Sequence, residues 1–281
     1  MKLELDSPAK INLWLRILAR REDGFHEVQT RLCKVAVADT VMLERRASGT
    51  GVEFTCSEPG LPLDDANLAV RALKAFEQRA GIQLAWRLHL EKRLPAGAGL
   101  GGGSGNAATV LRAANELTGR PLELTDLLDL AAGMGADVPF FLLDTPAADG
   151  SGRGEQVTPV ALAQPLFLVL LKPAFPVPTP WAYRQWAGSR ELPGICYAPQ
   201  PGPWGVLENS LERPVFEKYR LLPTLKTWLL EQPGVLAALM SGSGSTLFAV
   251  IRDEAAGHGL AVAAREWLGD SAWIQVTRSG V

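Results

Sequence analysis

The sequence predicts an α+β fold divided between two domains. A chain of 281 residues is longer than most single domains and can bury a large core. The N-terminal segment alternates apolar and polar residues with the period of a β-strand, at Leu3, Leu5, Ile11, Leu13, Leu15 and Ile17. Strand patterns come first in this half of the chain and helical patterns follow, which is typical of an α+β domain.

The rest of the first half supports that order. Further strands are predicted at 28–37, 40–44, 52–56 and 83–90. A helix is predicted over 66–80, where one apolar stripe is formed by Leu68, Ala72, Leu73 and Phe76. A second helix is expected over 104–117, because Gly119 marks its end. A third begins after Thr125, a candidate N-cap, and continues through Ala132.

The second half predicts a smaller, strand-rich domain. Residues 144–154 are rich in Asp, Gly, Pro and Ser and suit a passage between domains, so we expect domains at 1–150 and 151–281. The expected elements are strand 166–171, helix 223–230, strands 235–240 and 246–251, helix 255–268 and strand 273–277. This order is compatible with a ferredoxin-like layer.

The composition excludes several classes of function. A net charge of −2 gives no general attraction for nucleic acid. The chain has no apolar run of about 20 residues that could span a membrane, and no signal-peptide core. The three cysteines form no Cys-x-x-Cys pair and there are only three histidines, so neither a disulfide framework nor a multi-His metal centre is expected. These features favour a reducing, cytoplasmic location.

The segment Pro95–Ala108 carries the clearest functional pattern. Six glycines lie between Gly97 and Gly105, and a helical sequence follows directly. Glycine allows the backbone to approach a ligand closely, and a helix N-terminus adds unpaired N–H groups with partial positive charge. The segment therefore predicts an anion site, most often a phosphate site.

The common nucleotide-binding templates do not account for this segment. A Walker A loop needs a Gly-Lys dipeptide, and the chain has none. Gly97, Gly99 and Gly102 satisfy G-x-G-x-x-G, but the strand before them is half polar and Pro95 interrupts the entry. Protein-kinase signatures and a G-x-S-x-G elbow are also missing. A glycine-rich turn without a ligand remains the structural alternative.

Three segments together resemble the GHMP kinase superfamily, which includes galactokinase, homoserine kinase and mevalonate kinase. Pro95–Ala108 is similar to its central motif, Ala9–Leu13 to its N-terminal motif and Met240–Thr246 to its C-terminal glycine-rich motif. The resemblance implies a two-domain GHMP kinase fold, with an N-terminal lobe like domain 2 of ribosomal protein S5 and a C-terminal ferredoxin-like lobe. It also implies ATP as co-substrate and Mg²⁺ bridging the ATP phosphates.

Further segments are similar to one branch of this superfamily. They are Pro8–Leu13, Arg21–Glu27, Gly135–Phe141, Gly150–Glu155, Pro178–Pro180 and Asn209–Glu212. The resemblance implies that the acceptor is the 2-hydroxyl of a cytidine diphosphate-linked methylerythritol, in the non-mevalonate route to isoprenoid precursors. Two alternatives stay open: another GHMP kinase of the mevalonate or homoserine type, and a nucleotide-binding relative without catalysis.

Lys10 and Asp137 are the expected catalytic residues. Judged singly, Lys10 suits an exposed strand lysine and Asp137 suits a cap at a helix end before a strand. The resemblance assigns Asp137 as the general base and Lys10 as its partner, which keeps the carboxylate ionised. Asn12 lies two residues from Lys10 and so faces the same side of the strand, where the resemblance implies contact with the methylerythritol hydroxyls.

Aromatic residues are expected to bind the cytosine. The resemblance places Phe25 and His26 on one wall of its pocket, although a loop aromatic packed into the core would explain them equally well. The family more often has Tyr at position 25, so stacking is kept here while a bond through the phenol is lost. Tyr183 aligns with the aromatic of the opposite wall, and Trp181 and Trp186 are close competitors.

The remaining expected contacts lie on the glycine-rich segments. The expected ATP-binding residues are Pro95, Ala96, Gly97, Ala98, Gly99, Leu100, Gly101, Gly102, Gly103, Ser104 and Gly105, with Lys92 and Asn67 near the adenosine. Ser241, Gly242, Ser243 and Gly244 are expected to contact substrate. Ser104 is a candidate ligand of Mg²⁺, and Gly105 stands where the family often has Ser. We expect a small-molecule substrate, no nucleic-acid or membrane partner, and a monomer or weak homodimer.

Overall fold

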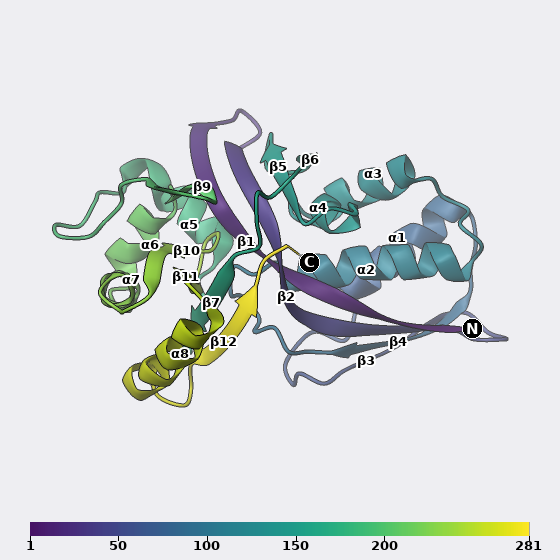
Figure 1. Cartoon of the computed structure of the whole chain (residues 1–281). Helices are drawn as coiled ribbons and strands as arrows, with labels where there is room; N and C mark the ends of the chain where they lie inside the picture. Colours follow the sequence, from purple (N-terminus) through teal and green to yellow (C-terminus); the bar gives the residue numbers. More distant parts are fainter. Residues whose placement is uncertain (281) are drawn as a thin grey trace.

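Two β-sheets organise the protein, whose residues 1–280 are described by a computed structural model (Figure 1). The larger sheet has the strand order β3-β4-β2-β1-β9-β8, and a β5–β6 hairpin is added to it through β2. Its strands are β1 (Lys2–Arg20), β2 (His26–Arg45), β3 (Gly51–Cys56), β4 (Ala85–Glu91), β5 (Ala147–Ser151), β6 (Gln156–Val160), β8 (Gln200–Gly202) and β9 (Gly205–Asn209).

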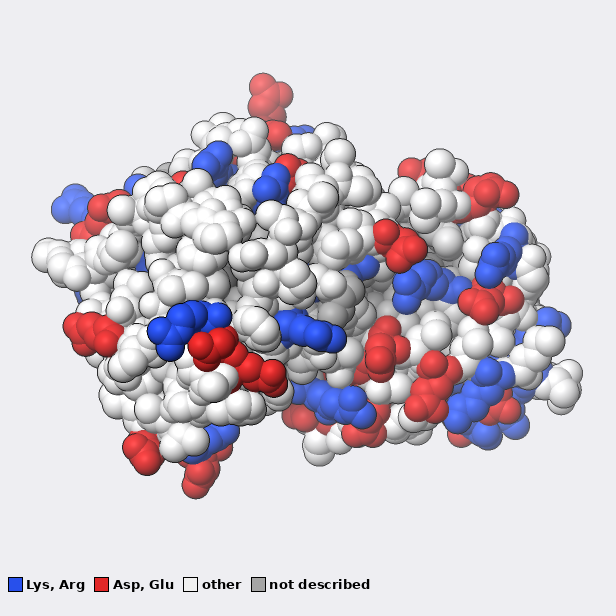
Figure 2. Space-filling model, viewed as in Figure 1, with Lys and Arg blue, Asp and Glu red and all other residues white. Residues whose placement is uncertain are grey.

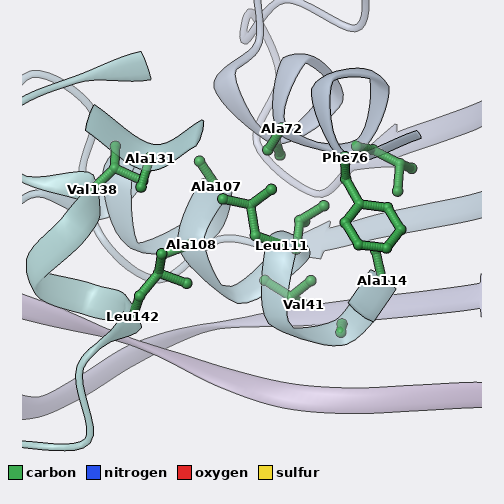
Figure 3. Packing of buried hydrophobic residues seen from close by; sticks show 14 of the residues in the cluster. Val41, Ala72, Phe76, Ala107, Ala108, Leu111, Ala114, Ala131, Val138 and Leu142 are labelled. Carbon is green, nitrogen blue, oxygen red and sulfur yellow. The ribbon is translucent and has the colours of Figure 1, made fainter. Parts of the chain in front are cut away.

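Four helices cover one face of the larger sheet (Figure 1). They are α1 (Leu68–Ala80), α2 (Gly102–Leu117), α3 (Leu124–Met134) and α4 (Val138–Leu142). Figure 3 shows Phe76 of α1 and Leu111 and Ala114 of α2 in the shared core, with Val41 of β2 below them. Burial of these apolar side chains is the main force that holds α2, and therefore its N-terminus, in place.

The second lobe is built on an antiparallel sheet of order β10-β11-β7-β12. Its strands are β7 (Phe167–Lys172), β10 (Val235–Met240), β11 (Leu247–Ile251) and β12 (Trp273–Arg278). The accompanying helices are α5 (Thr179–Gln185), a short 3₁₀ turn (Trp186–Gly188), α6 (Glu212–Lys218), α7 (Leu221–Leu230) and α8 (Glu254–Leu268). The chain order of this lobe, strand, helices, two strands, helix and strand, agrees with the ferredoxin-like prediction.

The long strands β1 and β2 connect the two lobes (Figure 1). Leu15 of β1 pairs with Asn209 of β9, and Val35 of β2 forms a bridge to Ser279 just beyond β12. A third apolar cluster joins side chains of both sheets, including Ile11 of β1 and Phe248 of β11. The lobes therefore share a core, which fixes the site at their junction.

Several local predictions were wrong, each for a local reason. β2 is continuous where two strands were expected, because Ala38 and Asp39 between the two expected segments still pair with β1. Helix α2 begins at Gly102 rather than 104, and α3 begins after Glu123 rather than Thr125. Residues 138–142 form a helix and not a strand, since Pro139 in the first turn needs no hydrogen-bond donor there.

The expected domain boundary falls inside a pair of bonded strands. Residue 150 lies in β5, which pairs with both β2 and β6 of the larger sheet. The Asp- and Gly-rich stretch at 144–154 forms β5 and the start of the turn to β6 rather than a linker, because β5 makes its backbone hydrogen bonds within the sheet. The four-stranded sheet begins only with β7. The chain therefore first passes from the larger sheet to the second lobe between residues 160 and 167.

Within residues 1–280, every helix is too short or too polar to cross a bilayer. Figure 2 shows acidic and basic side chains interspersed over the visible face, without a large region of one sign.

Candidate active site

Two glycine loops, one from each lobe, meet at the junction. The first is residues 97–101, before α2, and the second is residues 241–246, between β10 and β11. Ser241 Oγ donates to the Gly99 carbonyl at 3.0 Å, and the Thr246 N–H donates to the Ala98 carbonyl at 3.2 Å. A Cβ on Gly99 would lie 2.2 Å from the Ser241 carbonyl oxygen, so only glycine allows this approach.

The first glycine loop ends at the N-terminus of α2. Gly101 is the N-cap, in the left-handed region at φ 70°, and the helix starts at Gly102. The first-turn N–H groups and the partial positive charge of a 16-residue helix therefore point toward the junction. The geometry agrees with the predicted anion site, and the binding of a phosphate there stays a prediction.

Lys10 and Asp137 meet at the same place. Lys10 on β1 is 4% exposed, and its Nζ lies 2.7 Å from Asn12 Oδ1 and 3.4 Å from Asp137 Oδ2. Asp137 is the N-cap of α4 and keeps a third of its side chain exposed. Asn12 is held by its Nδ2 donating to Thr30 Oγ1 at 2.8 Å. The result is an accessible carboxylate beside a buried, oriented ammonium group.

Both glycine loops contact this pair. The Lys10 N–H donates to the Leu100 carbonyl at 2.9 Å, which joins β1 to the first loop. A Cβ on Gly242 of the second loop would lie 3.3 Å from Lys10 Nζ and 3.2 Å from Asn12 Oδ1. A carboxylate held by lysine next to an anion-binding helix end is suited to phosphoryl transfer to a hydroxyl group.

A group of aromatic side chains lies close to Asp137. The rings of His26 and Tyr183 are 5.5 Å apart between centroids, and Trp186 meets His26 edge-on at 6.0 Å. Phe25 is 53% exposed, with the Arg153 guanidinium 5.0 Å from its ring centre. His26, Tyr183 and Trp186 thus form one aromatic group, and the contact of these residues and of Phe25 with cytosine stays a prediction.

The third candidate aromatic, Trp181, points elsewhere. It packs edge-on against Tyr219 and lies under the Lys218 ammonium.

The surroundings shift the pKa values of both Tyr183 and His26. Burial raises the pKa of Tyr183, and the nearby negative charge of Asp137 raises it further. Burial, followed by the charge of Arg20, lowers the pKa of His26, which favours the neutral imidazole.

Lys92 and Asn67 both form hydrogen bonds with other residues of the protein, and Lys92 also forms an ion pair. Lys92 is buried in an ion pair with Asp39, donates to Asn106 Oδ1 at 3.0 Å, and lies close to Gly102. Asn67 caps α1: its Oδ1 accepts from the Ala69 N–H at 3.0 Å, and its Nδ2 donates to the Pro62 carbonyl. Their expected contacts with adenosine stay predictions.

Asp39 and Asn106 were missed by the sequence analysis. Asp39 is fully buried and also accepts from the backbone N–H groups of residues 93 and 94, at 2.8 and 2.9 Å. Asn106 in α2 donates to Asp39 and to Ser7, both at 3.0 Å. An acidic residue flanked by apolar strand residues was the available signal, since buried charges are usually paired.

Gly105 has a packing explanation. A Cβ there would lie 2.9 Å from Ser7 Oγ and 3.0 Å from the Pro8 carbonyl oxygen, so β1 leaves no room for a side chain.

Two residues of the second glycine loop also have contacts within the protein. Ser243 Oγ lies 2.7 Å from Thr179 Oγ1 at the start of α5, and Gly244 packs against Met240. Among residues 1–280, no cluster of three or more His, Cys, Asp or Glu could hold a metal ion.

Comparison with known proteins agrees with this geometry. Models of the GHMP kinases N terminal domain and the GHMP kinases C terminal region match residues 67–145 and 202–269. Fold and site together therefore define a GHMP kinase. This class is a small-molecule phosphotransferase with ATP as co-substrate, as the sequence motifs indicated.

Relatives and solved structures narrow the class. A 4-diphosphocytidyl-2-C-methyl-D-erythritol kinase of Methylacidiphilum infernorum is 38% identical over 96% of this chain and 94% of its own. The same enzyme of Geobacter metallireducens is 34% identical over 98% and 97%. A crystal structure of 4-(cytidine 5'-diphospho)-2C-methyl-D-erythritol kinase is 36% identical with a TM-score of 0.81, covering 99% of this chain and all of that one. The chain belongs to the 4-diphosphocytidyl-2-C-methyl-D-erythritol kinase family.

The alternative GHMP kinases share the fold but little sequence. A homoserine kinase structure from Cytophaga hutchinsonii has a TM-score of 0.71 at 18% identity, covering all of this chain and 97% of its own. Identity at that level supports a common fold and no more.

Proposed function

We propose that this protein transfers the γ-phosphate of ATP to the 2-hydroxyl of 4-diphosphocytidyl-2-C-methyl-D-erythritol. The observation that carries the proposal is the Lys10–Asp137 pair, because Lys10 lies against Gly101 at the start of α2 and Asp137 lies close to Tyr183 of the aromatic group. The helix end suits a phosphate, and the aromatic group suits a stacked base. Sequence identity of 34–38% to enzymes with this name supports the same substrate.

In the proposed mechanism, Asp137 accepts the proton of the attacking hydroxyl. Lys10 keeps the carboxylate ionised and stabilises the negative charge that develops on the oxygen. Asn12 orients the acceptor hydroxyls, because its amide is fixed by Thr30 and its oxygen by Lys10. The N–H groups at the start of α2 bind the ATP phosphates, and alignment of the two substrates supplies much of the rate enhancement.

We also propose Mg²⁺ as the accompanying cation. The donor set fits a weakly held ion, since Mg²⁺ is usually bound through substrate phosphates and one or two protein oxygens. Ser104 in the first turn of α2 supplies a hydroxyl at the right end of the helix. When bound, the ion neutralises charge on the phosphates during transfer.

The proposed setting is the cytoplasm, as a monomer or weak homodimer without nucleic-acid or membrane partners. The three cysteines are free thiols, and one of them, Cys196, is exposed, which suits a reducing compartment. Size-exclusion chromatography with light scattering measures the oligomeric state directly.

The test is an ATP-consumption assay with three acceptors. Purified protein is given ATP and Mg²⁺ with 4-diphosphocytidyl-2-C-methyl-D-erythritol, mevalonate or homoserine, and phosphorus NMR locates the new phosphate. We expect turnover with the first acceptor alone and a 2-phosphate product. Preferential turnover of mevalonate or homoserine would refute the proposed substrate, and ATP binding without transfer to any acceptor would favour a non-catalytic relative.

A further inference from the structure

The segment Asn209–Glu212 joins β9 to α6 and contacts the second glycine loop. Asn209 is 7% exposed, and its Nδ2 donates to the carbonyls of Met240 and Gly242, both at 2.7 Å. Its Oδ1 accepts from the Leu211 N–H at 2.9 Å. Both amide hydrogens and the amide oxygen are therefore used, which defines the orientation of the side chain.

Glu212 holds the same strand end from the other side. Its Oε1 accepts from the Met240 N–H at 2.9 Å, and its Oε2 pairs with Lys226 Nζ at 2.6 Å. Met240 thus has its N–H and its carbonyl bound by two side chains of one four-residue segment. The loop that follows Met240 starts from a fixed point.

That loop lies between the two halves of the site. Ser241, whose flanking carbonyls both bind Asn209, donates its own hydroxyl to Gly99 of the first glycine loop. Gly242 lies against Lys10 and Asn12 on the acceptor side. Asn209 itself is anchored to β1, because it pairs with Leu15 of that strand.

We propose that Asn209 is a positioning residue for phosphoryl transfer. It sets the place of residues 241–242 relative to Lys10 and to the first glycine loop, and so the alignment of the acceptor hydroxyl with the γ-phosphate. Asparagine is required because one nitrogen must donate to two carbonyl oxygens while the oxygen accepts an N–H. The readout by turnover rests on the proposed function, whereas the contacts do not.

The decisive variant is Asn209→Asp. A carboxylate is close in shape, cannot donate, and repels the two carbonyl oxygens. We expect kcat to fall about 10- to 100-fold, since a misplacement of about 1 Å can cost that much. KM for ATP and for the acceptor should stay within about threefold, because each substrate keeps its own contacts. Asn209→Ala removes the bonds without adding charge and should show the same split to a smaller extent.

Asn115→Asp is the matched control. Asn115 is 8% exposed and makes a similar pair of bonds, from its Nδ2 to the Leu122 carbonyl at 2.9 Å and from the Leu122 N–H to its Oδ1 at 3.0 Å. It lies in α2 near the end remote from the glycine loop. We expect this variant to lose thermal stability as Asn209→Asp does and to keep normal kcat.

Amide hydrogen exchange provides a readout that needs no acceptor. Loss of the Asn209 bonds should speed exchange in residues 240–246 and 97–101, and the control variant should leave both segments protected. A folded Asn209→Asp protein with normal kcat and unchanged exchange overturns the proposal, as does a raised acceptor KM with normal kcat. If the unmodified protein does not phosphorylate the acceptor, the proposed function fails, and exchange alone decides the role of Asn209.

Discussion

Two lysine–carboxylate pairs in this protein have the same chemistry and opposite surroundings. Lys226 and Glu212 lie 2.6 Å apart in the second lobe, and neither side chain is more than 2% exposed. Lys10 and Asp137 lie 3.4 Å apart at the junction, and a third of the Asp137 side chain remains exposed. The first pair is closed to any ligand and the second is open on its carboxylate side.

The difference lies in how the polar atoms are satisfied. Glu212 accepts from the Met240 N–H, and Lys226 donates to the Cys196 carbonyl, so this pair holds backbone in place. Burial raises the pKa of Glu212, and the charge of Lys226 opposes that rise. Among residues 1–280, Lys10 is the ion-pair partner of Asp137, and a third of the Asp137 side chain stays exposed. A carboxylate with free acceptor capacity can take a proton from a substrate, whereas a carboxylate whose oxygens are all hydrogen-bonded stabilises the fold.

The largest expected effect is a loss of kcat when the carboxylate of the open pair is removed, compared with the same change in a surface ion pair. Asp137→Asn should lower kcat by about 10²- to 10⁴-fold, the range of a lost general base, while ATP affinity measured by calorimetry stays unchanged. Asp149→Asn is the control, because Asp149 is similarly exposed and bonded to Arg31 at 2.7 and 2.9 Å. Near-normal turnover of Asp137→Asn would remove this residue from the role of base.

The closed pair should affect stability instead. Lys226→Met leaves Glu212 buried without its partner, and we expect a loss of about 3–5 kcal/mol in the free energy of unfolding. The double variant with Glu212→Gln should recover most of that loss, since no charge is left stranded and the amide oxygen can still accept from Met240. Urea unfolding measures both. Equal losses in the single and double variants would show that the buried charge is not the cause.

Asp39–Lys92 is a second closed pair, and it differs from Lys226–Glu212 because it lies beside the first glycine loop. Asp39→Asn keeps an acceptor for the backbone N–H groups of residues 93 and 94 but removes the charge that faces Lys92. We expect a loss of roughly 3 kcal/mol in stability and a several-fold rise in KM for ATP. KM for the acceptor should not change, and steady-state kinetics with each substrate varied in turn checks this. A rise in acceptor KM alone would contradict a role near the nucleotide.

The smallest expected effect comes from a buried lysine without a carboxylate in contact. Lys34 donates to the Leu143 carbonyl at 2.7 Å, and burial, then the charge of Arg112, lower its pKa from 10.5 to about 8. Between pH 8 and 10.5 the unfolded state binds more protons at this residue, so the free energy of unfolding should rise with pH in that window. Lys34→Met should lack this rise. Parallel pH slopes in the two proteins would contradict the prediction.

The sequence predicted most of the regular elements, because amphipathic patterns record which face of a strand or helix is buried. It also located the first glycine loop and the Lys10–Asp137 pair through their motifs. It did not predict the β5–β6 hairpin or α4, whose short segments contain Asp, Gly and Pro that suit turns equally well. Asp39 was missed because its partners are distant in sequence.

The sequence alone predicted the class of chemistry. A glycine loop before a helix favours an anion site wherever the helix lies, since the N–H groups and the dipole are local properties. Residue types alone could not say which lysine–carboxylate pair is open, because each pair joins an ammonium group to a carboxylate. The tertiary structure makes the distinction, because α7 and β10 pack against Glu212 at the start of α6 while Asp137 lies at the junction. Burial and the number of hydrogen bonds that a carboxylate accepts are properties of the assembled fold. They separate the reactive carboxylate from the structural one.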